Sequence, residues 1–259
     1  MTICLTSLKT AVYTSDKDKL FISKLDDAVY LAQKRQKPYF FSFLSEAEQA
    51  LAKQYLESIK FDSFGFFGGY ENSERKVLCL DYYEDDPEYP ISALEFKFRP
   101  ADKLTHRDFL GALMSLGIER ETVGDILVED GRCVVFVKSE IADYIKTQIS
   151  KIGRAGVKVT DADIASLPKG RGVEEKFAVV SSLRLDNIVA AVSGLSREKT
   201  KNLILSGNVT LNFFECTNIS KPVCEGDTVT VRGKGKYIIN GVMGETKKHR
   251  IRISIIHYR

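Results

Sequence analysis

A cluster of polar and cationic side chains lies in the C-terminal third of the chain, in the segment Ser196-Arg-Glu-Lys-Thr-Lys-Asn202. Serine commonly caps helices, so the segment predicts a helix that starts after Ser196 and carries Arg197 and Lys199 in its first turn. Cations there oppose the helix dipole, whereas free backbone N–H groups at the same end favour phosphate. The pattern indicates an anion-binding surface, although a solvated cationic helix face is the simpler alternative.

Two basic turns follow this helix. Arg232-Gly-Lys-Gly-Lys236 places Lys234 and Lys236 in a glycine-containing hairpin, where the backbone can approach phosphates closely. Lys247-Lys-His-Arg250 adds Lys247 and Lys248 before the last predicted strand. Residues 174–259 hold 14 Lys and Arg against 8 Asp and Glu, although the whole chain has a formal net charge of only +3. This third of the chain therefore has the charge expected of a nucleic-acid module.

Two short helices and several strands must position these side chains. The apolar spacing predicts helices over 185–193 and 196–205, with Gly207 and Asn208 forming a left-handed turn after the second. Strands are predicted at 176–181, 209–211, 228–232, 236–240 and 250–257. Glu225-Gly-Asp227 predicts a structural tight turn before the strand at 228. Residues 161–173 read as a linker that precedes this domain.

The order of these segments resembles the S-four-type RNA-binding domain. The matching segments are Leu183-Arg-Leu-Asp186, Ser196-Arg197, Ser206-Gly-Asn-Val-Thr-Leu-Asn212, Glu225-Gly-Asp227 and the Gly-Lys-Gly turn at 233–235. In that family the two helices and the following hairpin contact folded RNA. Carried over by position, the resemblance implies RNA contacts at Arg184, Ser196, Arg197, Lys199, Lys201 and Asn202.

Arg184-Leu-Asp186 also resembles the catalytic Arg-Leu-Asp of pseudouridine synthases. In those enzymes Thr and Gly follow the aspartate at short fixed offsets, whereas here Asn-Ile-Val-Ala-Ala-Val follows and opens a helix. We therefore predict that Asp186 is a helix-start carboxylate rather than a catalytic residue.

The middle of the chain has a regular alternation of patterns. It predicts a strand at 91–98, a helix from its cap Thr105 to Leu116, a hairpin of 124–128 with 132–137, a helix at 139–152 and a strand at 157–160. This β-α-β-β-α-β order is that of a ferredoxin-like unit. Three polar residues could contact RNA here, namely His106, Arg107 and Arg120. The strand 132–137 lacks the exposed aromatic residues on which RRM sheets stack bases.

The N-terminal part predicts a helix at 15–36, a second helix capped by Ser45 with Glu48 at the capping-box position, and strands at 64–67 and 76–82. Residues 1–90 hold 11 Lys and Arg against 15 Asp and Glu, which favours protein over RNA contacts. The fold class is α+β with three small domains. These are an N-terminal α/β domain at 1–88, a central RRM-like domain at 89–165 and the S-four-type domain at 174–259.

The segment 104–128, with Phe67-Gly-Gly-Tyr70 and Glu74-Arg75 before it and the S-four-type domain after it, resembles the YlmH family over nearly the whole chain. The resemblance implies a bacterial, cytoplasmic factor that binds rRNA and peptidyl-tRNA on the large ribosomal subunit. It also implies a role in ribosome-associated quality control of stalled nascent chains, in a family linked to division-gene neighbourhoods.

Other function classes lack their sequence signals. No apolar run approaches the roughly 18–20 residues that cross a membrane, and the five cysteines include no Cys-x-x-Cys pair. A dinucleotide-binding glycine loop, a zinc-ligand cluster and a Walker lysine are also missing from the sequence. We therefore expect a monomer with no catalytic residue, metal, cofactor, small-molecule substrate or membrane partner. The alternatives are an RNA-modifying enzyme, of pseudouridine synthase or methyltransferase type, and a protein-interaction scaffold linked to cell division.

Overall fold

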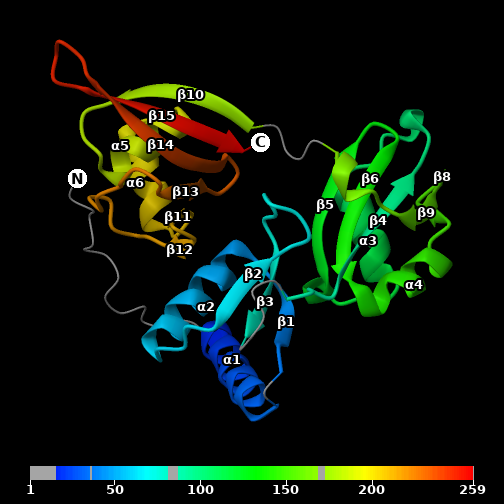
Figure 1. Cartoon of the computed structure of the whole chain (residues 1–259). Helices are drawn as coiled ribbons and strands as arrows, with labels where there is room; N and C mark the ends of the chain where they lie inside the picture. The colour runs from blue at the N-terminus through cyan, green and yellow to red at the C-terminus, as the bar shows by residue number, and fades with distance from the viewer. Residues whose placement is uncertain (1–15, 36, 81–86, 169–172, 259) are drawn as a thin grey trace. The chain divides into compact units, whose positions relative to one another are not determined.

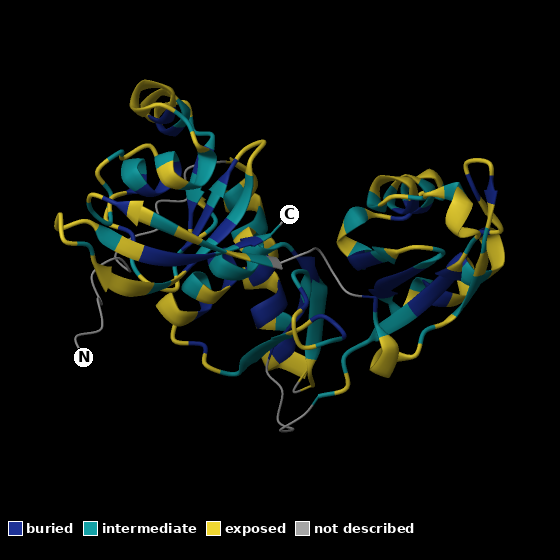
Figure 2. Ribbon diagram, turned by 90° about the horizontal axis from the view of Figure 1, so that it is seen from above, coloured by how far each residue is buried: buried dark blue, intermediate teal, exposed yellow. Residues whose placement is uncertain are grey.

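The computed structural model describes residues 16–35, 37–80, 87–168 and 173–258. They form two compact units, one within residues 16–168 and one within residues 173–258, and both mix helices with antiparallel sheets (Figure 1). The α+β class is therefore confirmed. Buried residues concentrate where helices cover a sheet (Figure 2). Among the described residues, no helix combines the length and apolar character needed to cross a bilayer.

The first unit begins with a three-stranded sheet covered by two helices. Its elements are α1 (Asp16–Arg35), β1 (Tyr39–Leu44), α2 (Glu46–Ser58), β2 (Phe64–Phe67) and β3 (Lys76–Leu80), with strand order β1-β3-β2. Leu25, Leu56 and Leu78 lie in the core between the helices and the sheet. The predicted capping box is confirmed, because the Ser45 backbone N–H donates to Glu48 at 2.8 Å. The end of the strand predicted at 76–82 lies outside the described residues.

A four-stranded sheet follows in the same unit, with strand order β5-β6-β4-β9. The elements are β4 (Ile91–Lys97), η1 (Pro100–Asp102), α3 (His106–Ser115), η2 (Arg120–Thr122), β5 (Val123–Glu129), β6 (Arg132–Lys138), α4 (Ser139–Gln148), β7 (Lys151–Ile152), β8 (Ala155–Gly156), β9 (Lys158–Asp161) and η3 (Ile164–Ser166). The main strands and helices follow the predicted order. The helix predicted to reach Ile152 ends at Gln148 instead, because residues 151–156 turn through Gly153 (φ 58°) into the hairpin β7–β8.

The two sheets of this unit share a buried cluster. Phe43 and Val77 of the first sheet pack with Leu127, Val134 and Phe136 of the second. This contact explains why residues 16–168 form one compact unit. The domain boundaries predicted at residues 88–89, 165 and 174 remain predictions.

A buried carboxylate reinforces that contact. Asp125 of β5 accepts hydrogen bonds from the Tyr70 hydroxyl at 2.8 Å, the Glu74 backbone N–H at 2.7 Å and the Arg75 backbone N–H at 3.0 Å. The Arg75 guanidinium donates to the backbone carbonyls of Val123 and Phe43. The segments 67–70 and 74–75, which carried part of the family resemblance, thus fasten one sheet to the other.

The second unit contains a six-stranded antiparallel sheet with two helices packed on one face. Its strand order is β10-β15-β14-β13-β11-β12. The elements are β10 (Val173–Val180), α5 (Leu185–Ser193), α6 (Arg197–Leu205), β11 (Val209–Leu211), β12 (Phe214–Glu215), β13 (Thr228–Val231), β14 (Gly235–Glu245) and β15 (Ile251–Tyr258). Leu185, Ile188 and Ile204 of the helices are fully buried in its core.

Three details of this unit differ from the predictions. The strand predicted at 236–240 continues to Glu245, with two irregularities in its pairing that the alternation of residues did not reveal. The short strand β12 was not predicted, and the segment read as a linker contributes to β9 and β10. The predicted turns are confirmed at Gly207 (φ 71°) and at Gly226, whose N–H donates to Ile239 at 2.8 Å.

Candidate nucleic-acid interface

The helix α6 separates an apolar face from a cationic face. Ser196 caps it, and its side chain accepts a hydrogen bond from the Lys199 backbone N–H at 3.5 Å. Thr200 and Ile204 are buried, one turn apart on the face that packs toward the core. The remaining spacing puts Arg197, Lys199, Lys201 and Asn202 in solvent, as their exposure confirms.

A cleft of about 410 Å³ lies beside α5 and α6. It brings together three of the predicted contact residues, Arg184, Arg197 and Lys201. The polar side chains of Ser181, Ser182, Asn187 and Thr200 also line it. Asp186, Ala190 and Ile219 complete the lining, so the two helices present one concave surface of mixed polar and apolar character that carries three cations.

The charges in this cleft are not equivalent. The Arg184 guanidinium is paired with the carboxylate of Asp186 at 3.0 and 3.1 Å. Asp186 also accepts from the Asn187 backbone N–H at 3.0 Å, and its predicted position at the start of α5 is confirmed. In contrast, no ion pair is found for Arg197, Lys199 or Lys201 in the described part of the chain. These three cations are available to an external anion.

The residues that sequence reasoning missed are the uncharged members of the cleft. Asn187 donates from its side chain to the Ser182 hydroxyl at 2.8 Å, which fixes the turn between β10 and α5. Thr200 is 1% exposed, and its hydroxyl has no hydrogen-bond partner among the described residues. Its position in the buried stripe of α6 could have been read from the spacing, whereas its place in the cleft depends on how the two helices pack.

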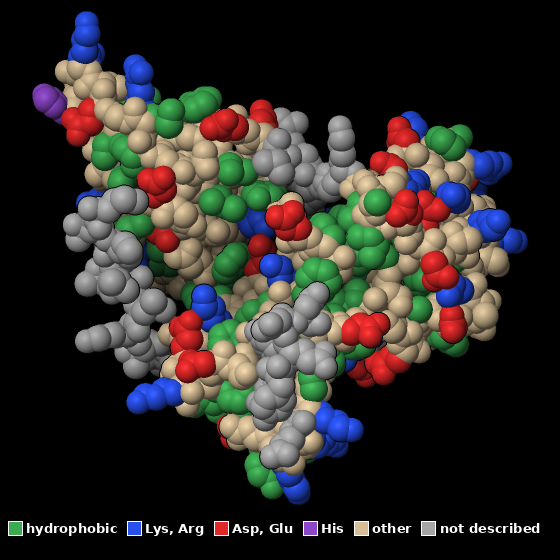
Figure 3. Space-filling model, in the orientation of Figure 1, with side chains coloured by type: hydrophobic (Ala, Val, Ile, Leu, Met, Phe, Trp, Pro, Cys, Tyr) green, Lys and Arg blue, Asp and Glu red, His purple; other side chains and the backbone are tan. Residues whose placement is uncertain are grey.

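The two basic turns lie at opposite ends of β14. Lys234 and Lys236 stand where β13 turns into β14, and the Lys236 ammonium lies 4.5 Å from the centre of the Tyr258 ring. Lys247 and Lys248 are exposed in the turn between β14 and β15, and basic side chains mark that tip in Figure 3. Ten residue steps of strand separate the two ends by about 33 Å. The basic turns are therefore two surfaces rather than one.

The three candidate RNA-contact residues of the first unit have different surroundings. His106 and Arg107 occupy the first turn of α3, where the Thr105 N–H donates to Asp108 at 2.7 Å. Arg120 is half-buried, and its guanidinium donates to the backbone carbonyl of Val123 at 2.5 Å. Burial and the neighbouring Arg75 lower the pKa of Arg120 to about 10. Arg120 is thus committed to the protein's own backbone.

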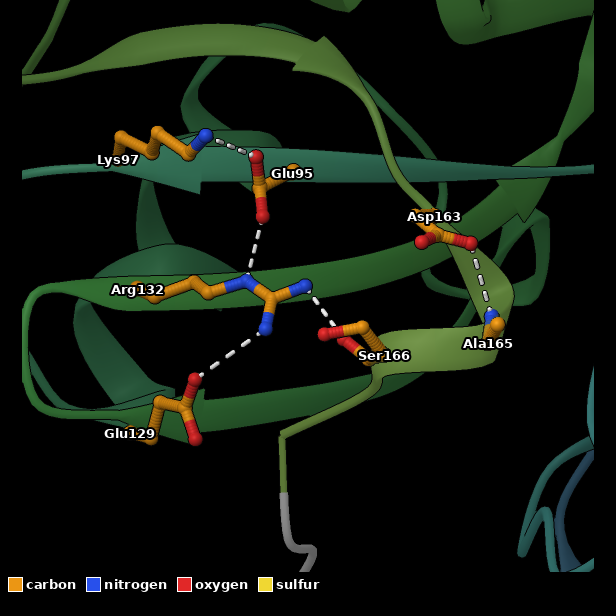
Figure 4. Close-up of polar contacts among 7 residues, drawn as sticks. All are labelled: Glu95, Lys97, Glu129, Arg132, Asp163, Ala165 and Ser166. Carbon is orange, nitrogen blue, oxygen red and sulfur yellow. Dashed lines mark hydrogen bonds and ion pairs between the residues drawn. The ribbon is translucent and has the colours of Figure 1, made fainter.

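The face of the four-stranded sheet opposite its helices is largely closed. Val134 and Phe136 are fully buried, and the Tyr70 ring stacks on Phe136 with centroids 4.9 Å apart. Arg132 closes the other end of the face, because it bonds Glu95, Glu129 and the backbone carbonyl of Ser166 (Figure 4). The predicted lack of exposed aromatic residues on β6 is confirmed.

Comparison with known proteins places this arrangement in a family. The model of a putative RNA-binding domain in YlmH matches residues 85–166, which contain the four-stranded sheet. The ribosome-associated protein quality control protein P2 of Bacillus subtilis is 30% identical over 242 residues, covering 92% of this chain and 94% of that protein. The chain belongs to the YlmH family. Family membership thus confirms the resemblance that the segments 67–75 and 104–128 indicated.

A solved YlmH structure supports the fold. The cell division protein ylmH from Streptococcus pneumoniae matches 58% of this chain and 94% of its own chain, with a TM-score of 0.52 and 22% sequence identity. At 22% identity the match shows a shared fold only.

Proposed function

We propose that this YlmH-family protein is a non-enzymatic, cytoplasmic RNA-binding factor that acts on the large ribosomal subunit. Its targets are structured rRNA and peptidyl-tRNA, and its process is the quality control of stalled nascent chains. The observation that carries the proposal is the concave surface of α5 and α6, which Arg197 and Lys201 line, together with Lys199 on the same helix. All three cations are exposed and have no ion pair within the described chain. Cations left unpaired by the protein are the groups that neutralise phosphates.

The start of α6 is suited to a phosphate in two ways. Free backbone N–H groups and the helix dipole favour an anion at the helix start, and Arg197 and Lys199 add full charges in the same turn. The paired Arg184 and Asp186 can orient a sugar or base edge through hydrogen bonds rather than through net charge. Such contacts read the shape of a folded RNA backbone more than its sequence.

The relatives support the cellular setting. One relative carries ribosome-associated quality control in its name, and the matching family model describes a putative RNA-binding domain. The large subunit and peptidyl-tRNA are our extension of these names to this chain. We also propose that the protein acts as a monomer. Its cationic unit can bind RNA while its acidic unit binds protein, so bridging the two needs no self-association.

Co-sedimentation with purified large subunits tests the proposal. We expect Arg197→Ala with Lys201→Ala to reduce the bound fraction at least about tenfold, because two phosphate contacts are lost. Lys17→Ala with Lys24→Ala removes the same charge from exposed sites on α1 and is the matched control. Equal binding of the two double variants would reject the α5–α6 surface as the ribosome contact.

The non-enzymatic part of the proposal has its own test. The Asp186 carboxylate already accepts from Arg184 and from the Asn187 N–H, which supports a structural rather than a nucleophilic role. Mass spectrometry of ribosomal RNA and tRNA from a strain lacking the protein should show every modified nucleotide of the parent strain. One modification that disappears and returns with the wild-type gene would make the protein an RNA-modifying enzyme.

A further inference from the structure

The first unit contains a groove that the proposed RNA contact does not use. It has a volume of about 600 Å³ and lies between β2 and the four-stranded sheet. Its walls include Phe67, Tyr89, Phe136 and Ile164, and the carboxylate-bearing Glu88 stands at its edge. Phe67 is 40% exposed and Ile164 is 55% exposed, so apolar surface faces solvent here. Large apolar side chains grouped in an open groove are typical of a binding site.

The aromatic residues of the groove are arranged to hold a cation. The ring centroids of Phe67 and Tyr89 are 5.4 Å apart, and the rings are inclined by 57° rather than stacked face to face. Two inclined rings in contact can both direct π-density toward a guanidinium or ammonium group that lies against the open side of the pair. Glu88 is exposed beside Tyr89 and can neutralise that group.

The charge of the groove argues against a nucleic acid. Among the described residues that line it, none is a lysine or an arginine. Residues 10–170, which include this whole unit, hold 22 Lys and Arg against 27 Asp and Glu. A phosphate backbone would thus meet a net negative surface, whereas a cationic and apolar ligand is complementary in both respects.

The position of β2 indicates the form of that ligand. β2 pairs with β3 on one side and is the last strand of its sheet in the order β1-β3-β2. Gly65 and Phe67 of this strand line the groove, so an extended chain can run along the edge while one of its side chains enters. Extended peptides are commonly recognised in this way at sheet edges, with pockets for alternate side chains.

We propose that this groove binds an extended peptide segment in which arginine or lysine alternates with apolar residues. The cationic side chain lies against the exposed side of the Phe67–Tyr89 ring pair next to Glu88, and an apolar neighbour contacts Ile164. The site is separate from the α5–α6 surface. It gives the protein a peptide partner in addition to RNA, and peptide binding at this groove does not depend on the proposed RNA-binding function.

The experiment measures fluorescence anisotropy of a fluorescein-labelled peptide of alternating leucine and arginine, titrated with the full chain. The matched probe replaces each arginine with citrulline, which keeps the shape and removes the charge. A labelled oligouridylate tests the nucleic-acid alternative. We expect saturable binding of the arginine peptide, at least about fivefold weaker binding of the citrulline peptide, and no displacement by the oligouridylate.

Three variants connect the binding to the groove. Phe67→Ala should weaken the arginine peptide by about fivefold or more, and Glu88→Gln by about two- to fivefold. Ile164→Ser repeats the test at a second exposed wall in case Phe67→Ala alters the melting curve. Glu140→Gln, an exposed carboxylate on α4, is the charge-matched control. No saturable binding, equal binding of both peptides, displacement by the oligouridylate, or an equal effect of Glu140→Gln would each overturn the proposal.

Discussion

Three arginines of the first unit and one arginine of the second have opposite surroundings. In the first unit, Arg75, Arg120 and Arg132 donate to the protein's own carbonyls and carboxylates and are half-buried. In the second, Arg197 is exposed with Lys199 and Lys201, and none of the three has an ion pair within the described residues. The same side chain therefore binds the protein's own groups in one unit and remains available to an external anion in the other. Partners and burial, rather than residue type, separate the structural cations from those that we propose to bind RNA.

The largest expected effect tests the structural side of this comparison. Asp125→Ala removes the acceptor of three hydrogen bonds and leaves the Tyr70 hydroxyl and two backbone N–H groups without it. We expect the free energy of unfolding of the first unit to fall by about 3–5 kcal/mol. Chemical denaturation of the full chain, followed by fluorescence of its tyrosines, measures the change.

Two controls make that result specific. Asp130→Ala, in the exposed turn between β5 and β6, should change stability by no more than about 0.5 kcal/mol. Tyr70→Phe removes only one of the three donors and should cost about 1 kcal/mol. A fully stable Asp125→Ala protein would mean that the apolar cluster around Phe136 alone holds the sheets together.

A smaller effect is expected at Arg132, and it has a pH signature. Hydrogen bonds from Lys97 and from Arg132 hold the pKa of Glu95 below its ordinary value. Such a carboxyl adds stability that is present above its ordinary pKa of about 4.3 and is lost as pH falls through the lower folded pKa. Arg132→Met should cost about 2 kcal/mol at pH 7 and weaken this acid-dependent component.

Glu95→Gln is the matched variant for that pH dependence. It cannot titrate, so its unfolding free energy should lack the contribution of Glu95 to the loss of stability below about pH 4.3. Denaturation series at pH 7 and at pH 3 measure the difference for each variant. Parallel pH curves for wild type and Glu95→Gln would show that the network of Figure 4 contributes nothing through charge.

For the exposed cations, we expect substitution to change the salt dependence of RNA binding rather than the stability of the fold. With transfer RNA as the probe, Arg197→Ala with Lys201→Ala should lower the slope of log affinity against log salt by about 1.4–1.8, since each lost phosphate contact removes about 0.7–0.9. Lys17→Ala with Lys24→Ala should leave the slope unchanged. Filter binding between low and moderate salt measures both slopes, and identical slopes would place the RNA elsewhere.

The sequence predicted the local structure of both units well, for a physical reason. Caps, turns and apolar spacing are short-range signals, so Ser45, Ser196 and Gly207 could be placed before any tertiary contact was known. The burial of Arg120 could not, because it depends on the packing of η2 against β1. The carbonyls that its guanidinium contacts belong to Val123 and Gly124, only three and four residues further along the chain.

The same limit applies to the cleft and to the closed sheet face. Thr200 and Asn187 belong to different helices, and their joint place in the cleft follows from the helix–helix contact. The basic turns at Lys234 and Lys247 were predicted as two features, but the distance that the length of β14 puts between them was not, because the strand was predicted to end at residue 240. Charge composition predicted which unit would carry the excess of cations, without predicting which of them lack an ion pair among the described residues.

The smallest expected effect distinguishes RNA binding from folding, because one substitution should weaken RNA binding and increase the free energy of unfolding. Lys199 lies in the first turn of α6, where a cation opposes the helix dipole. Lys199→Glu should therefore raise the free energy of unfolding of the second unit by about 0.3–1 kcal/mol while it weakens RNA binding. Lys201→Glu, nearer the middle of the helix, should weaken binding without the gain in stability. A cation at a position where it destabilises its own helix is best explained by an external anion that binds there. If Lys199→Glu instead lowered stability and left binding unchanged, Lys199 would belong with the structural cations of the first unit.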